Sequence, residues 1–273
     1  MITTCEARKD DLLLNLEDIS MSFGEVYALN GINLDVTRGD ITSIIGPNGA
    51  GKTVMMNCIN GLYHPQRGSI YFKGQKINGL SPHKRAELGI GRTFQKLELY
   101  GGMTVLDNIR MGSHIHLKSG IASGSVFVGK AKREEIEERK FIEEEIIDLL
   151  EIEGIRDHVA HMLPYGLQKR VELGRALALR PEIILLDEPM AGLNLEEVED
   201  MARFILDINE EERWKVTCVL VEHDMGVVMD ISHRVLVLDF GNMITDGPPE
   251  EVSKNPQVIK AYLGEEDLYI TRK

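Results

Sequence analysis

Eight consecutive residues early in the chain have the types and order needed to hold phosphate groups. The pattern G-x-x-x-x-G-K-[S/T] is met by Gly46, Pro47, Asn48, Gly49, Ala50, Gly51, Lys52 and Thr53. Glycines let successive backbone N–H groups converge on phosphates, the lysine ammonium spans the β- and γ-phosphates, and the threonine hydroxyl ligates Mg²⁺ at a helix N-terminus. An apolar run at 41–45 and a helix-like stretch at 54–60 flank the motif, which disfavours a plain glycine-rich turn with a surface lysine. The sequence predicts a nucleoside triphosphate site.

Two acidic residues follow a second apolar, strand-like run at 183–186. Asp187 stands where a carboxylate can hold Mg²⁺, directly or through water, beside the phosphate loop. Glu188 is then next to the γ-phosphate, where a carboxylate orients and polarises an attacking water. A strand that simply ends in solvated acids is the alternative, and the phosphate loop upstream disfavours it.

Strand-like segments must position these two groups. Short strands are predicted at 12–19, 27–36 and 41–45, with a hairpin at 69–72 and 75–77 around Lys73-Gly74. Runs rich in leucine and β-branched residues, typical of a parallel sheet, follow at 183–186, 216–221 and 234–239, the first two separated by a helix-like segment at 195–212.

Between these two sets of strands the pattern is helical, from Met103 to about Arg180, apart from a Gly/Ser-rich stretch at 119–129 that we interpret as a loop. Ile142, Ile146, Leu149 and Leu150 share one face of a helix whose other faces carry Glu, Lys and Arg. We interpret that charged surface as solvated. A final helical pattern begins at Pro248 and runs to Gly264.

The predicted fold class is α/β: a P-loop NTPase core with an N-terminal antiparallel β subdomain and an inserted helical subdomain. The expected divisions are 1–95 for the β subdomain and phosphate-loop part of the core, 96–175 for the helical subdomain, 176–247 for the rest of the core, and 248–273 for a C-terminal helix and tail.

Composition limits the classes of partner. The 273 residues carry a net charge of -13, which argues against a protein that wraps nucleic acid, since that usually needs a basic face. Cys5, Cys58 and Cys218 are odd in number and lack metal-ligand spacing, so reduced thiols are expected. No apolar run approaches the roughly 20 residues of a membrane-spanning helix.

The chain resembles the ATP-binding subunits of ABC transporters over nearly its whole length. Six motifs stand in that family's order. After the P-loop come 92–95 (RTFQ, the Q-loop), 163–167 (LPYGL, followed by QKR, the signature), 186–189 (LDEP, Walker B), 191–194 (AGLN, the D-loop) and 221–224 (VEHD, the switch histidine).

That resemblance implies ATP as the nucleotide and further roles for side chains. Gln95 touches Mg²⁺ and the attacking water while sensing membrane subunits, and His223 hydrogen-bonds the γ-phosphate; an amide and an imidazole suit those tasks. Phe23 stands at the place of the adenine-stacking aromatic, with Tyr27 as a nearby competitor. A facing subunit's ATP is contacted by the signature and D-loop residues Tyr165, Gly166, Leu167 and Asn194.

Three departures from the family pattern bear on function. Val54 replaces a second hydroxyl after Thr53, which removes one contact near the α-phosphate. Pro164 and Tyr165 replace serine and glycine of the signature, so a serine hydroxyl is missing and Gly166 and backbone N–H groups remain. Asn194 replaces the D-loop aspartate, keeping an acceptor without its charge.

The Tyr-Gly signature, the segment 101–109, the long helical insertion and the ending 255–264 are similar to ATPases of branched-chain amino-acid importers. The implied partners are transmembrane permeases, a second ATPase subunit, with a heterodimer favoured over a homodimer, and indirectly a periplasmic binding protein, at the cytoplasmic face of the inner membrane. A lipopolysaccharide-type export ATPase shares part of the pattern. A soluble ABC ATPase acting on nucleic acid or ribosomes is the third alternative.

Overall fold

An antiparallel sheet forms the N-terminal part of the computed structural model, which describes residues 11–116 and 130–261. Its strand order is β2-β1-β4-β5. The strands are β1 (Leu12–Phe23), β2 (Val26–Thr37), β4 (Arg67–Phe72) and β5 (Gln75–Lys76). The predicted hairpin closes through Lys73 and Gly74, whose φ angles of 51° and 72° match the right-handed twist of the strands. The predicted antiparallel subdomain is confirmed.

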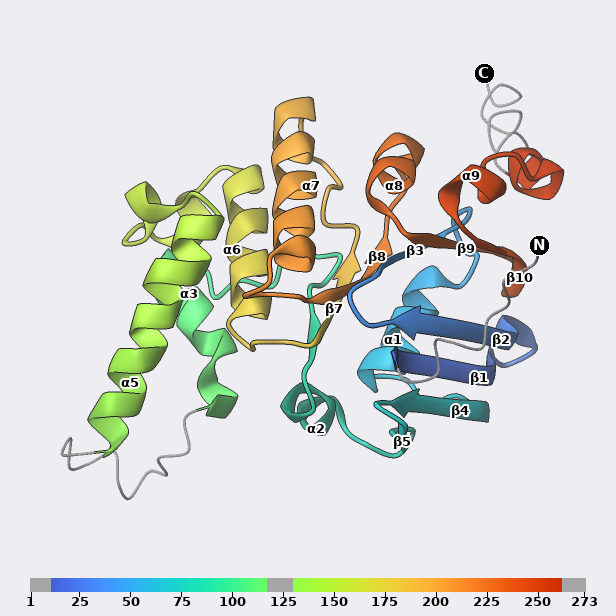
Figure 1. Cartoon of the computed structure of the whole chain (residues 1–273), viewed down its shortest axis with the longest axis horizontal. Coiled ribbons are helices and arrows are strands. Elements are labelled where there is room, and N and C mark those ends of the chain that lie inside the picture. Colours follow the sequence, from blue (N-terminus) through green and yellow to red (C-terminus); the bar gives the residue numbers. More distant parts are fainter. Residues whose placement is uncertain (1–10, 117–129, 262–273) are drawn as a thin grey trace.

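A six-stranded sheet forms the centre of the molecule, in the order β10-β9-β3-β8-β7-β6 (Figure 1). Its strands are β3 (Ile41–Ile45), β6 (Ile90–Arg92), β7 (Ile183–Asp187), β8 (Thr217–Val221), β9 (Arg234–Asp239) and β10 (Asn242–Gly247). The pairs β3–β8, β3–β9 and β7–β8 are parallel, as the apolar runs predicted; β6–β7 is parallel as well, and in this sheet the β9–β10 pair is antiparallel. The sequence analysis missed β6, which has three residues, and β10, which is polar.

Helices cover both faces of the central sheet. In Figure 1, α7 (Leu195–Glu210) and α8 (Met225–Ile231) lie above it, while α1 (Lys52–Asn60) and the antiparallel sheet lie below. Met55, Met56 and Ile59 of α1 are fully buried in one cluster with residues of both sheets, so α1 is fixed between them. The shorter helices are α2 (Pro82–Glu87) and α9 (Pro249–Val252), and residues 256–261 are also helical.

The predicted helical region is a set of shorter pieces. Its elements are α3 (Val105–Gly112), η1 (His114–His116), α5 (Lys130–Phe141), the π-helix η2 (Ile142–Ile147), η3 (Glu153–Ile155), η4 (Ala160–Met162) and α6 (Tyr165–Leu177). A single periodic pattern cannot show these breaks, because each depends on packing with neighbours. The predicted loop at 119–129 lies outside the described residues.

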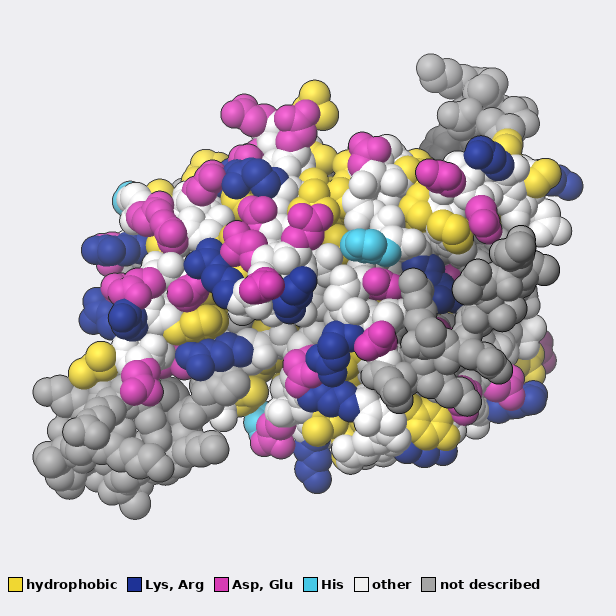
Figure 2. Space-filling model, in the orientation of Figure 1, with side chains coloured by type: hydrophobic (Ala, Val, Ile, Leu, Met, Phe, Trp, Pro, Cys, Tyr) yellow, Lys and Arg dark blue, Asp and Glu magenta, His cyan; other side chains and the backbone are white. Residues whose placement is uncertain are grey.

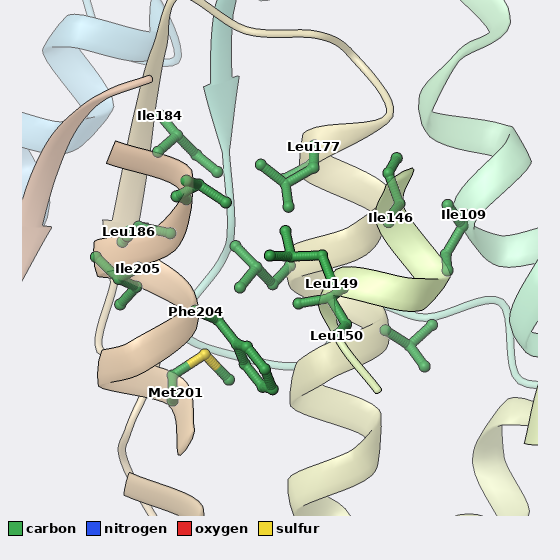
Figure 3. Close-up of a cluster of buried hydrophobic side chains, with 14 of the residues drawn as sticks. Ile109, Ile146, Leu149, Leu150, Leu177, Ile184, Leu186, Met201, Phe204 and Ile205 are labelled. Atoms are coloured by element: carbon green, nitrogen blue, oxygen red, sulfur yellow. The ribbon is translucent and has the colours of Figure 1, made fainter. Parts of the chain in front are cut away.

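One apolar cluster joins the helical region to the central sheet (Figure 3). Leu149 and Leu150 lie against α6, Ile146 lies beside Ile109 of α3, and Ile184 and Leu186 of β7 belong to the same cluster. Ile142 is buried there too, so the predicted apolar face is confirmed. Because the cluster includes β7, its apolar packing continues from the helical region into the core, across the division expected between residues 175 and 176. The domain boundaries stay predictions.

The outer face of the helical region is charged. Figure 2 shows acidic and basic side chains intermixed over α5, α6 and α7. On α5 and the following turn, Arg139 pairs with Glu143 at 3.0 Å and Lys140 with Glu144 at 3.5 Å, both one helical turn apart. Exposed pairs of this kind contribute little stability, roughly 0.3–0.5 kcal/mol each, so this surface is a solvated face as the sequence indicated.

Trp214, in the segment after α7, connects that segment to the helical region. Its ring lies 5.7 Å from the ring of Phe141, and the neighbouring Arg213 pairs with Glu145 at 2.7 Å.

Cys58 and Cys218 are buried free thiols, and burial raises their pKa to about 11 and about 12. Cys5 lies outside the described residues. In the part of the chain that the structure describes, no helix is long and apolar enough to cross a membrane.

Candidate functional site

The loop between β3 and α1 has a backbone that only glycine accommodates. Gly46, Gly49 and Gly51 have φ angles of 148°, 83° and 107°, in the region that L side chains rarely adopt. A Cβ atom on Gly46 would lie 2.1 Å from the carbonyl oxygen of Leu238, and one on Gly51 would lie 2.3 Å from that of Ala28. The loop is therefore pressed against β9 and β2, which fixes its shape before any ligand binds.

Lys52 lies at the centre of this loop. It is buried, and its ammonium donates hydrogen bonds to the carbonyl oxygens of Gly46 at 2.5 Å and Pro47 at 3.1 Å. Helix α1 starts at Lys52 without a side-chain cap from Gly51. Its first-turn N–H groups and the lysine together form the positive end that binds phosphate in such loops. The predicted phosphate-binding residues, including Asn48, Ala50 and Thr53, thus form one continuous loop and helix start.

Three predicted catalytic side chains meet at the carboxyl ends of neighbouring parallel strands. Glu188 follows β7, Gln95 follows β6 and His223 follows β8. The Gln95 amide Nε2 donates to Glu188 Oε2 at 2.9 Å, and His223 Nε2 lies 3.0 Å from Glu188 Oε1. Each carboxylate oxygen of Glu188 therefore has its own partner, and the carboxylate is held in one orientation.

Asp187 closes β7 and is buried. Arg92 Nη2 donates to its Oδ2 at 3.0 Å, whereas no described residue places a hydrogen-bond donor at its Oδ1. Burial raises the pKa of Asp187, and the positive charge of Arg92 opposes the rise. A carboxylate oxygen without a partner, with the Thr53 hydroxyl and the Gln95 amide oxygen as the other predicted ligands, is the hard oxygen donor set that Mg²⁺ prefers. These residues fit the predicted metal.

Arg92 is a residue of the site to which the sequence analysis gave no role. It also donates through Nη1 to Asn57 Oδ1 of α1 at 2.7 Å, and its guanidinium lies 5.0 Å from the centre of the Phe94 ring. It thereby joins the phosphate-loop helix, the end of β7 and the segment that carries Gln95. One feature of the sequence could have indicated its role: Arg92 is a charged residue that directly follows the apolar Ile90-Gly91, in the segment that forms strand β6.

The two candidates for contact with the base lie on one hairpin. Phe23 ends β1 and Tyr27 lies on β2, and both are exposed, at 48% and 63%. The Phe23 ring also makes an edge contact with Tyr63, with centroids 5.5 Å apart. An exposed ring held by a neighbour suits stacking on a base. Phe23 stays the preferred prediction, because Tyr27 has no ring contact among the described residues.

The signature and D-loop residues form a second group. Helix α6 begins at Tyr165, and the preceding Pro164 provides no side-chain cap. A Cβ on Gly166 would lie 2.2 Å from Oε1 of Glu197, so α6 packs against the start of α7 at this glycine. Asn194 caps α7: its side chain accepts from the Glu197 N–H at 3.0 Å, and Glu197 accepts from the Asn194 N–H at 3.0 Å.

Two residues of the predicted signature differ in their surroundings. Tyr165 is exposed, with its ring beside Gly192 of the D-loop. Leu167 packs against the apolar cluster of the helical region. The tyrosine ring is therefore the exposed part of the signature, whereas Gly166 is buried and the leucine side chain serves packing.

Comparison with known proteins identifies the family. Residues 29–191 match the family model described as ABC transporter. The chain belongs to the ABC transporter ATPase family. Residues 242–267 of this ABC ATPase also match the family described as branched-chain amino acid ATP-binding cassette transporter. The family resemblance inferred from the six motifs is confirmed.

Curated relatives match this ABC ATPase nearly end to end. It is 40% identical to the high-affinity branched-chain amino acid transport ATP-binding protein BraF of Pseudomonas aeruginosa, and 39% identical to LivG, of the same description, from Escherichia coli strain K12. Each alignment covers 93% of this chain and 98% of the relative.

Solved structures agree with the fold. A crystal structure of the ADP conformation of an ATP-binding cassette of an ABC transporter matches with a TM-score of 0.79 at 32% identity, covering 93% of this ABC ATPase and 99% of that chain. A dimeric ATP-binding cassette in a post-hydrolysis state, bound to ADP and Pi, matches with a TM-score of 0.72 at 28% identity, covering 87% and 99%. The predicted ABC ATPase fold is confirmed.

Proposed function

We propose that this chain is the ATP-hydrolysing subunit of an ABC importer for branched-chain or related hydrophobic amino acids. ATP hydrolysis is supported by the position of Glu188, whose carboxylate is held between Gln95 and His223 at the ends of the parallel strands. Glu188 directly follows Asp187, the predicted Mg²⁺ ligand. The substrate class follows from the curated relatives, which are branched-chain amino acid transport proteins matched over 93% of this chain. The exporter and nucleic-acid alternatives have no comparable support.

The residues divide the work of hydrolysis. Lys52 and the N–H groups of the loop hold the phosphates, and Phe23 covers the base. Glu188 orients the attacking water, while Gln95 and His223 hold the carboxylate and contribute hydrogen bonds near the γ-phosphate. Positioning and charge stabilisation supply most of the catalysis in phosphoryl transfer. Mg²⁺, when bound through Thr53, Gln95 and Asp187, neutralises charge on the β- and γ-phosphates.

The ATP site is completed by a second ATPase subunit. The start of α6 has no side-chain cap and carries the exposed Tyr165, which suits a phosphate of a facing subunit, since helix N-termini attract anions. Asn194 then lies beside that contact. Because the signature lacks a serine hydroxyl, self-pairing is expected to be weak, and a heterodimer with an ATPase that has a complete signature is the preferred assembly.

The membrane partner is a permease, and a cleft beside the Q-loop is the proposed contact. The cleft has a volume of about 740 Å³ and runs between α2 of the core and α3, η1 and α6 of the helical region. Phe94, Leu99 and Tyr100 line one side, within a few residues of Gln95. A groove lined by apolar side chains together with charged ones such as Glu98 and Arg175 suits an amphipathic helix of a partner. We commit to a cytoplasmic helix of the permease as its occupant, which sets this subunit at the cytoplasmic face of the inner membrane.

Reconstitution tests this function. The chain would be co-expressed with candidate permeases and a candidate second ATPase subunit, placed in liposomes, and supplied with a candidate periplasmic binding protein. ATP-dependent uptake of labelled leucine, isoleucine or valine is expected, and a Glu188→Gln control should abolish it. ATPase activity that responds to lipopolysaccharide or nucleic acid, and to none of the amino acids, would contradict the importer assignment.

A further inference from the structure

Helix α6 carries a buried ion pair outside the catalytic group. Lys169 and Glu172 lie one helical turn apart, and their side chains are 1% and 2% exposed. Their charged atoms, Nζ and Oε2, are 3.8 Å apart. Two ions removed from water lose several kcal/mol of hydration each, and a single long contact does not offset that loss. Each of the two therefore needs a further partner.

Both further partners belong to the catalytic segments. Glu172 Oε1 accepts the backbone N–H of Phe94 at 3.2 Å, and Phe94 directly precedes Gln95. Lys169 Nζ donates to the backbone carbonyl oxygen of Glu188 at 3.4 Å. Since the side chains of Gln95 and Glu188 are themselves hydrogen-bonded, the contacts form a closed ring through the buried pair.

The backbone of Glu188 is the part of this ring that needs support. Its φ angle is 51°, a left-handed conformation that is strained for a non-glycine residue and persists only where its surroundings fix it. On one side the Glu188 N–H donates to the carbonyl oxygen of Val221 at 2.9 Å. On the other, its own carbonyl receives Lys169 and the N–H of Ala191, the latter at 3.3 Å.

We propose that Lys169 and Glu172 are positioning residues that tie the signature helix α6 to the catalytic Glu188 and to the Gln95 segment of the same chain. The pair fixes where the Glu188 carboxylate points without touching nucleotide. Because α6 begins at Tyr165, one turn before Lys169, the helix end that faces a partner subunit and the chain's own catalytic carboxylate are parts of one rigid unit. This inference rests on the proposed ATPase function and adds two residues to it.

Neighbouring Arg170 offers a matched control. It lies on the same helix and pairs with Asp200 of α7 at 2.5 Å, but its contacts are with α7 and residues 150–151, not with the Glu188 or Gln95 segments. Arg170→Gln therefore breaks an ion pair of α6 and leaves the ring intact. Lys169→Gln opens the ring at Glu188, Glu172→Gln weakens it at Phe94, and Lys169→Arg keeps the charge.

The test measures turnover and nucleotide affinity of the full chain, with melting temperature as the measure of folding. Lys169→Gln is expected to lower kcat about 10-fold or more, because small misplacements of a catalytic group carry losses of up to about 100-fold. Its affinity for a fluorescent ATP analogue should stay within about twofold of the parent's, since the P-loop is untouched. Lys169→Arg should recover most of the turnover, and Arg170→Gln should retain it.

A double variant covers the case in which Lys169→Gln does not fold. Lys169→Gln with Glu172→Gln leaves no charge unpaired in the helix, and it must show the same loss of turnover. Parent-level turnover in that folded variant, or equal losses in Lys169→Gln and Arg170→Gln, would overturn the inference alone. A parent chain that binds ATP but does not hydrolyse it, alone or with its partner subunits, would overturn the proposed function and this inference together.

Discussion

The two halves of the proposed ATP site are built differently. The nucleotide half adds functional side chains to the backbone N–H groups of its loop: Lys52 and Glu188 have defined hydrogen-bond partners, and Asp187 is held by Arg92. The signature half relies on backbone, because α6 starts without a side-chain cap and Gly166 is pressed against Glu197. The nucleotide half can therefore be disabled by changing a functional group, whereas the signature half depends on shape and on the start of one helix.

The largest effect should come from the catalytic carboxylate. Glu188→Gln keeps the size of the side chain but removes the charge that orients water and replaces one acceptor oxygen with an NH₂ group. Loss of a positioned acid–base group typically lowers turnover by about 10²–10⁴-fold, while binding is unaffected. ATPase rate and nucleotide affinity would be measured on one preparation. Turnover near the parent value would remove Glu188 from its proposed role.

Lys52→Ala should act on binding. The variant deletes an ammonium that otherwise contacts phosphate, and hydrogen bonds of charged groups contribute about 1.5–3 kcal/mol. Mg-ATP affinity is expected to fall roughly 10- to 100-fold on that basis. Equilibrium titration checks it, with the exposed Lys76→Ala as a control that should bind normally. Parent-like affinity in Lys52→Ala would contradict the phosphate-loop assignment.

In the signature half, Gly166→Ala should act through shape. The added methyl carbon would lie 2.2 Å from Glu197 Oε1, so the Glu197 side chain must turn aside and leave the α7 capping box. Loss of a capping contact costs about 1 kcal/mol of unfolding free energy. The control is Gly154→Ala, where no atom lies within 4 Å of the new carbon. Denaturant unfolding of both variants tests the difference, and equal stability would show that Glu197 moves aside without a loss of stability.

The smallest effect should follow Pro164→Ser. A serine at the cap position can accept a first-turn N–H of α6 and can also reach a facing phosphate. The gain of a hydrogen bond, about 1 kcal/mol, corresponds to roughly fivefold tighter ATP-dependent self-association. Light scattering in a Glu188→Gln background measures it. If the parent already forms a tight homodimer, the proposed weakness of this signature is wrong, and with it the heterodimer preference.

The parts of the fold that could be predicted are those with a pattern visible in a short stretch of sequence. The runs that became β3, β7, β8 and β9 were predicted because buried parallel strands are continuously apolar. β10 was missed because it is an antiparallel edge strand whose residues are half exposed and polar. The π-helix at Ile142–Ile147 was missed because its apolar residues also fit an ordinary helix. The phosphate-loop motif could be recognised from the sequence because its residues lie within eight positions, and its role in binding phosphate stays a prediction.

The supporting residues could not be predicted in the same way. Arg92 joins Asn57 and Asp187, which are 35 and 95 positions away, and neither partner is visible from its own surroundings in sequence. Lys169 and Glu172 lie in a helical segment with several charged residues, and nothing in the sequence distinguishes them from residues of a solvated helix face. Asn194 was assigned to a partner's ATP, and its capping of α7 emerged only with the structure. Chemistry-bearing motifs are local, and the residues that hold them in place are not.

The packing of Trp214 against Phe141 has a practical consequence. Trp214 is the only tryptophan among the 273 residues, and its indole N–H is buried with no hydrogen-bond partner in the described ranges 11–116 and 130–261. Indole emission shifts in wavelength with the polarity of its surroundings. Any rotation of the helical region away from the segment after α7 would expose the ring to water and shift its emission to longer wavelength. The unlabelled protein thus contains its own optical sensor of movement between those two parts during the ATP cycle.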